Sequence, residues 1–141
     1  MGNGNNKRNA SKTSRVIIMA SKAYEKGYRF ERYIFSKLSE SGFYCVRSAG
    51  SHGVFDIIAI YHGRVFGIQC KLNGQITNAE LRRMLKVADE HKIMPVIAQK
   101  YNRKTVLIRA DTFEKYDLKS FIHAVKKMEI WHPTKPQTST L

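Results

Sequence analysis

The chain has 141 residues, of which 43% are hydrophobic, enough for one globular domain with a buried core. Its two cysteines, Cys45 and Cys70, are too few for a disulfide framework, and no apolar run is long enough for a secretory signal or for the ~18 residues of a membrane span. The net charge of +14 favours a polyanionic partner such as nucleic acid; the open alternative is a basic protein without such a partner. We therefore expect a reduced, cytoplasmic protein that associates with nucleic acid and not with a membrane.

The first 21 residues are predicted to form a basic, disordered arm, because the segment MGNGNNKRNASKTSR is rich in Asn, Ser and Lys. The first 22 residues carry five basic residues and no acid, so the remaining chain, with 20 basic and 11 acidic residues, keeps a net charge of +9. Four cations of the arm are expected to contact nucleic-acid phosphates: Lys7, Arg8, Lys12 and Arg15. Residues 130–141 are predicted to be a flexible tail, which leaves 22–129 as the folded domain.

Periodicity and turn residues predict helices and strands between these two ends. In chain order we expect a helix over 22–41, a strand over 43–48, a loop over 49–53, a hairpin with strands near 54–61 and 64–71, a helix over 78–92, strands over 94–101 and 105–110, and a helix over 117–128. Gly42 suits the C′ position of the first helix, and Thr77 with Glu80 forms a capping box for the second. The fold class is therefore α/β, with a mixed β-sheet flanked by helices.

Glu31 is the first residue that departs from the pattern of a simple core. On a helical wheel with about 100° per residue, it falls at the centre of the apolar stripe of the first helix, near Tyr24, Phe35 and Leu38. A buried carboxylate needs a cation, a hydrogen-bond donor or a metal as a partner. Two interpretations stay open, a salt bridge to a neighbouring arginine and a functional carboxylate.

The hairpin VFDIIAIYHGRVFGIQCKL, residues 54–72, carries three more such residues. With a two-residue His62-Gly63 loop, Tyr61 pairs with Arg64, and counting back sets Asp56 opposite Gln69. Lys71 lies two residues beyond Gln69 and shares its face. The alternative is an edge strand with polar residues in solvent, but apolar residues on both faces of the first strand favour a central strand. Asp56, Gln69 and Lys71 are therefore expected to form a site.

At these residues the sequence resembles the archaeal-type Holliday junction resolvases, within the PD-(D/E)xK nuclease superfamily. The stretches that carry the resemblance are KGYRFERYIFSKLSESGFYCVRSAGSHGVFDIIAI and GIQCK, and the similarity extends over about residues 26 to 109. The D…xxK core is a weak signal by itself, and the FER and VRSAGS segments make it specific. The resemblance implies a restriction-endonuclease-like fold and a homodimer that cuts four-way DNA junctions with magnesium, or with manganese as a substitute.

The resemblance also implies roles for individual residues. Glu31, Asp56 and Gln69 stand at metal-site positions, and Lys71 stands at the position of the catalytic lysine. Family positions that assist at the scissile phosphate or in the mobile loop are occupied here by Arg32, Arg47 and Ser51. Phe55 stands where the superfamily name has Pro.

Gln69 is the main departure, because the family pattern has Glu there. Glutamine keeps a carbonyl oxygen for a metal but removes one negative charge, so the affinity for a hard cation is expected to be lower. Two functions follow from the sequence. The first is a junction-resolving endonuclease, and the second is a non-catalytic, basic DNA-junction-binding protein on a nuclease fold.

Overall fold

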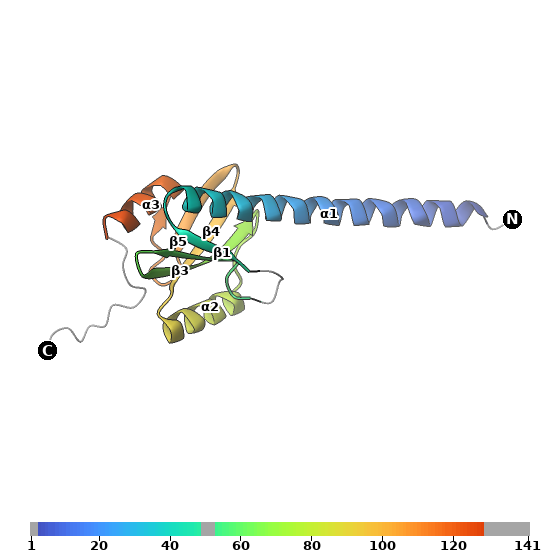
Figure 1. Cartoon of the computed structure of the whole chain (residues 1–141). Coiled ribbons are helices and arrows are strands. Elements are labelled where there is room, and N and C mark those ends of the chain that lie inside the picture. Colours follow the sequence, from blue (N-terminus) through green and yellow to red (C-terminus); the bar gives the residue numbers. More distant parts are fainter. Residues whose placement is uncertain (1–2, 49–52, 129–141) are drawn as a thin grey trace.

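The computed structural model describes residues 3–48 and 53–128, with side chains described from residue 21 onward. Helices and strands follow one another in the order shown in Figure 1. They are α1 (Asn3–Glu40), β1 (Tyr44–Arg47), β2 (Ile57–Tyr61), β3 (Arg64–Leu72), α2 (Asn78–His91), β4 (Met94–Tyr101), β5 (Lys104–Arg109), β6 (Lys115–Tyr116) and α3 (Leu118–Lys126).

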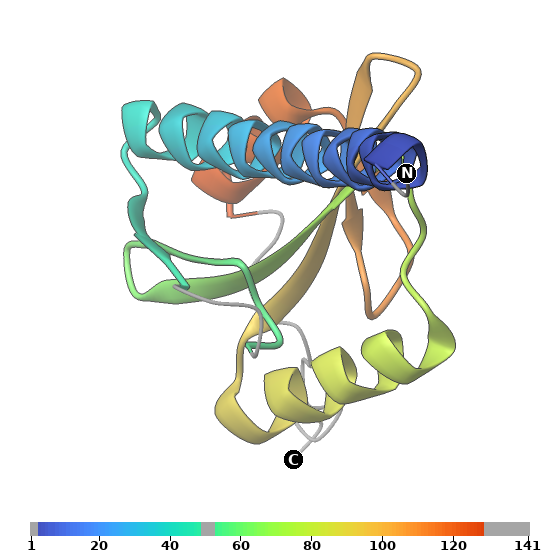
Figure 2. The same cartoon turned by 90° about the vertical axis from the view of Figure 1, so that its right-hand side faces the viewer.

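The six strands form one sheet in the order β1-β2-β3-β4-β5-β6. Only β3 and β4 pair in parallel, and α2 makes the crossover between them. The other neighbouring strands pair antiparallel. Figure 2 shows α1 and α3 on one side of the sheet and α2 on the other. The predicted α/β class with a mixed, helix-flanked sheet is confirmed, and β2 lies between two strands, as a central strand should.

Each face of the sheet buries its own hydrophobic cluster. The cluster on the α1 and α3 side includes Ile34, Leu38, Ile57, Phe66, Ile68, Val96, Leu107 and Phe121. The cluster on the α2 side contains Phe55, Met84, Ala88, Ile97 and Ala110. Burial of apolar area at roughly 25 cal/mol per Å² makes these two layers the main source of stability. The strands that carry polar site residues are thus held by apolar neighbours on both faces.

The first helix differs from the prediction, since it begins at Asn3 rather than near Lys22. Residues 3–21, predicted as a disordered arm, are therefore helical in backbone, and Figure 1 shows this part of α1 extending past the sheet. Once a helix is anchored, each added residue gains a hydrogen bond without a new nucleation cost. The prediction of a disordered arm rested on amino-acid composition, which does not include this gain from an anchored helix. A domain boundary at residue 22 stays a prediction, and residues 130–141 lie outside the described part.

Several local predictions are confirmed. The hairpin pairs Tyr61 with Arg64, and His62 and Gly63 both have positive φ, as a two-residue type I′ turn requires. The capping box between Thr77 and Glu80 is present at the start of α2. Gly42 adopts a φ of 97° just after α1 ends. The sequence did not predict β6, whose two residues are too few to show a period.

Candidate functional site

A hollow of about 460 Å³ lies where α1 meets β1 and the segment that leads into β2. Its lining includes Tyr28 and Glu31 from α1, Arg47 at the end of β1 with the next residue Ser48, and Asp56. Three of the residues predicted for the site, Glu31, Arg47 and Asp56, therefore face one concave surface although they come from three segments of the chain.

Glu31 lies at the edge of the buried face of α1, not at its centre. The buried residues of this helix are Phe30, Ile34 and Leu38, whereas Tyr24 is 75% exposed, so the centre predicted from the helical wheel was wrong. The wheel treated all apolar residues alike, but the sheet covers only one side of the helix. The Glu31 side chain is 25% exposed and lies 3.4 Å from Arg47 Nη2. The salt-bridge interpretation is thus observed, within the same hollow as Asp56.

Arg47 keeps hydrogen-bonding capacity that its ion pair does not use. Its guanidinium lies 4.4 Å from the centre of the Tyr28 ring, and its buried Nε has no hydrogen-bond partner among the described residues. Arg32 is exposed on α1 and donates to the Tyr28 hydroxyl at 3.4 Å. Both arginines lower the pKa of the Tyr28 hydroxyl, Arg32 the more strongly. Tyr28, which lines the hollow, thus contacts two guanidinium groups.

Asp56 is fixed by the backbone of β3. The hairpin ladder ends at the pair Ile57 and Ile68, and Asp56 lies one residue before it. Its N–H donates to the Ile68 carbonyl at 2.8 Å, and its Oδ2 accepts the Cys70 N–H at 2.7 Å. Asp56 therefore contacts the backbone on both sides of the half-buried Gln69.

A close contact upstream helps to position Asp56. A Cβ atom on Gly67 would lie 2.7 Å from the ring of Phe55, so the glycine lets this ring pack directly on β3. Phe55 is buried in the cluster on the α2 side. Because Phe55 immediately precedes Asp56, this packing fixes the direction in which the chain enters the site.

Burial dominates the electrostatics of the two carboxylates. It raises the pKa of Glu31, and the negative charge of Asp56 raises it further, while Arg47 opposes the shift. Burial also raises the pKa of Asp56, against the hydrogen bond from Cys70. The same surroundings raise the pKa of the Cys70 thiol, chiefly through burial. This shift disfavours the thiolate, the form in which a cysteine acts as a nucleophile.

Lys71 makes an ion pair that the sequence did not predict. Its Nζ lies 2.8 Å from Oε1 of Glu80, the third residue of α2. The other oxygen of Glu80 accepts the Thr77 N–H at 2.8 Å, as the capping box requires. These interactions lower the pKa of Glu80, with Lys71 as the largest cause. Glu80 was expected only to start a helix; its position nine residues after Lys71, at a helix N-terminus, was the available signal.

Comparisons with known proteins show the family of the chain. The family model described as archaeal Holliday junction resolvase (Hjc) matches residues 22–130. The chain belongs to this family. It is 33% identical over 89 residues to the crossover junction endodeoxyribonuclease Hjc of Methanocaldococcus jannaschii, an alignment that covers 60% of the chain and 66% of that relative. The matched part is thus slightly less than two thirds of the curated relative.

A solved structure supports the fold. The 1.6 Å structure of Archaeoglobus fulgidus Hjc, a Holliday junction resolvase from an archaeal hyperthermophile, superposes with a TM-score of 0.54. The identity is 23%, and the match covers 68% of this chain and 87% of that one. The restriction-endonuclease-like α/β fold predicted from the sequence is thereby confirmed.

The three predicted metal positions carry side-chain types that a hard divalent cation accepts. Glu31 and Asp56 offer carboxylate oxygens, and Gln69 offers an amide oxygen, all ligand types that Mg²⁺ accepts. Within residues 3–48 and 53–128, no three His, Cys, Asp or Glu side chains come together in a way that could hold a metal ion. Because the third position is an amide, water and phosphate oxygens would have to complete the coordination shell.

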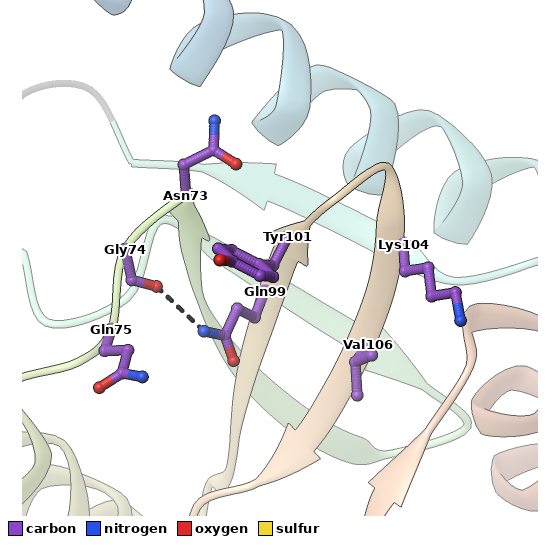
Figure 3. A pocket seen from close by; sticks show the side chains of 7 residues that line it. All are labelled: Asn73, Gly74, Gln75, Gln99, Tyr101, Lys104 and Val106. Carbon is purple, nitrogen blue, oxygen red and sulfur yellow. Dashed lines mark hydrogen bonds between the residues drawn. The ribbon is translucent and has the colours of Figure 1, made fainter.

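A second hollow, of about 640 Å³, lies between the segment that follows β3 and the strands β4 and β5. It is lined by Asn73, Gly74, Gln75, Gln99, Tyr101, Lys104 and Val106. Figure 3 shows the Gln99 amide directed at the Gly74 carbonyl, to which it donates at 3.0 Å. Gln99 pairs with Lys71 in the β3–β4 ladder. This hollow contains none of the predicted site residues, so it forms a neighbouring surface and not the site itself.

Some predicted residues are not placed by the structure. Ser51 lies outside the described residues. Lys7, Arg8, Lys12 and Arg15 lie on the N-terminal part of α1, whose side chains are not described. The helices of the described part include none that is long and apolar enough to cross a membrane.

Proposed function

We propose that this chain is a structure-selective DNA endonuclease that resolves four-way junctions by metal-dependent hydrolysis of a phosphodiester. The observation that carries the proposal is the convergence of Glu31, Arg47 and Asp56 on one hollow, with two carboxylates that burial makes costly to ionise. Desolvated carboxylates reduce folding stability, and proteins retain them at functional sites, where a bound ligand can stabilise the charges.

Each residue has a role in this proposal. Glu31, Asp56 and the Gln69 carbonyl would hold Mg²⁺, with Mn²⁺ as a substitute. The bound ion would supply Lewis-acid activation of the phosphate and of a water molecule. The guanidinium of Arg47, whose side chain is 30% exposed, would donate to a phosphate oxygen, and Arg32 would bind an adjacent phosphate. Lys71 would offset negative charge that builds on the phosphate as water adds to phosphorus and one P–O ester bond breaks.

The wider DNA contact and the assembly belong to the same proposal. Lys7, Arg8, Lys12 and Arg15 would bind backbone phosphates along the first half of α1, and Ser51 would assist in the loop before Asp56. A four-way junction needs two related cuts, so we propose a homodimer with two-fold symmetry that offers one site to each strand.

The second candidate is a protein that binds junctions without cutting them, and Gln69 favours it because the site has one carboxylate fewer. Cleavage of a labelled four-way junction and of a matched linear duplex, in Mg²⁺, Mn²⁺ or EDTA, separates the two functions. We expect junction cleavage with either metal, none in EDTA, and much less cutting of the duplex. Asp56→Asn should bind the junction but not cut it. Binding without cleavage by the wild type in both metals would support the second candidate.

A further inference from the structure

Among the described residues, the Lys71 ammonium makes one ion pair, and its partner is Glu80. The pair is partly shielded, with the two side chains 23% and 35% exposed. Glu80 cannot easily turn away, because its second oxygen accepts the Thr77 backbone N–H at 2.8 Å. The carboxylate is thus fixed at a helix N-terminus, where a negative charge is favoured.

Position 69 explains why Lys71 needs such a partner. Gln69 lies two residues before Lys71 on β3 and carries no charge that could orient an ammonium group. Asp56 interacts electrostatically with Lys71, but its Oδ2 accepts the Cys70 N–H. A lysine side chain has many rotamers, so a reaction that depends on its position requires something to hold it.

We propose that Glu80 is a positioning residue for Lys71, supplying from α2 the negative charge that is absent at position 69. The inference rests on the proposed function of the site. A role as a third metal ligand fits less well, since both Glu80 oxygens are already used by Lys71 and Thr77. Glu80 acts through Lys71 and touches neither substrate nor metal.

Three variants separate positioning from simple helix capping. Glu80→Gln keeps an oxygen for the Thr77 N–H, because glutamine also completes a capping box, but it removes the charge beside Lys71. Glu80→Asp keeps the charge on a shorter side chain. Thr77→Ala removes the capping hydroxyl and leaves the Glu80–Lys71 pair in place. Melting temperatures of all three report any loss of folding.

The first measurement is single-turnover cleavage of a four-way junction at saturating Mg²⁺. We expect Glu80→Gln to cut about ten- to a hundredfold more slowly, a loss of the size that misplacement of a catalytic group produces. Glu80→Asp should recover part of the rate, and Thr77→Ala should stay within about threefold of wild type, since it loses only a cap. Junction affinity and the Mg²⁺ concentration for half-maximal rate should not change.

The second measurement needs no cleavage. Acetylation of Lys71 in the full, DNA-free chain is followed by mass spectrometry, and we expect it to be faster in Glu80→Gln but not in Thr77→Ala. If the wild type proves inactive, this labelling still tests the pair. Equal labelling of Glu80→Gln and wild type would overturn the inference. So would a rate loss shared equally by Thr77→Ala, or a raised Mg²⁺ requirement in Glu80→Gln, which would make Glu80 a cap or a metal ligand.

Discussion

The two ion pairs on either side of Asp56 differ in how completely their donors and acceptors are used. Arg47 lies 3.4 Å from Glu31 and keeps a buried Nε without a partner in the described chain. Lys71 lies 2.8 Å from Glu80, and both Glu80 oxygens accept hydrogen bonds. A long pair with a partly exposed guanidinium is suited to bind a phosphate, whereas a short pair with both carboxylate oxygens in use is suited to fix a side chain. We therefore expect the Arg47 pair to serve phosphate binding and the Lys71 pair to serve positioning.

The largest effects should come from removing the cation of each pair. Lys71→Ala should lower the single-turnover cleavage rate by at least about 10²-fold, the loss typical for a group that stabilises developing charge, with junction affinity nearly unchanged. Arg47→Ala should instead weaken junction binding by about tenfold or more, because a hydrogen bond to a charged group is lost. Cleavage rates and fluorescence anisotropy measured on both variants test this division. The comparison fails if both variants lose affinity to the same extent.

Gln69→Glu adds a carboxylate at the position between Asp56 and Lys71 and tests whether residue 69 is a metal ligand. The added charge should lower the Mg²⁺ concentration for half-maximal cleavage several-fold, since charge governs hard-cation affinity. Metal-free stability should fall slightly, because the new carboxylate would repel Glu31 and Asp56. Titration of Mg²⁺ and Mn²⁺ against the cleavage rate of both proteins measures the first effect. An unchanged or raised metal requirement in a folded variant would mean that residue 69 is not a ligand.

The smallest expected effects are on folding stability. Substitutions of Asp56 and of Glu80 should change the melting temperature at neutral pH in opposite directions. Burial raises the pKa of Asp56, so without metal the folded state loses stability as pH rises through the range between the ordinary and the raised pKa. Asp56→Asn should therefore raise the melting temperature at pH 7 by a few degrees and not at pH 3. Lys71 lowers the pKa of Glu80, so that carboxylate stabilises the fold above its ordinary pKa, and this contribution is lost on acidification.

Glu80→Gln is the counterpart of Asp56→Asn. It should lower the melting temperature slightly at pH 7, and below the lowered pKa of Glu80 the variant and the wild type should melt at the same temperature. Thermal melts of both variants in EDTA across pH 3–7 measure the two trends. A stabilising Glu80→Gln or a destabilising Asp56→Asn at neutral pH would contradict the assignment of Asp56 as the desolvated group and Glu80 as the paired one.

Short-range chemistry made much of the fold predictable. The turn at His62-Gly63 sets the hairpin register because two-residue loops allow few geometries. The capping box at Thr77 and Glu80 starts α2 because the two residues satisfy each other's backbone donors. Apolar residues on both faces of the first hairpin strand predicted that β2 is central, which the sheet order confirms.

The sequence by itself thus determined the α/β class, most element positions, the hairpin register and a set of residues that the family resemblance marks for the site. Only the tertiary structure decided which side of α1 is buried, and hence that Glu31 stands at its edge beside Arg47. It also decided that Lys71 meets Glu80 rather than a charge on its own strand. Turns, caps and strand periods depend on residues a few positions apart, whereas these pairs depend on how a helix packs on the sheet. That packing is set by the whole core, which no local pattern encodes.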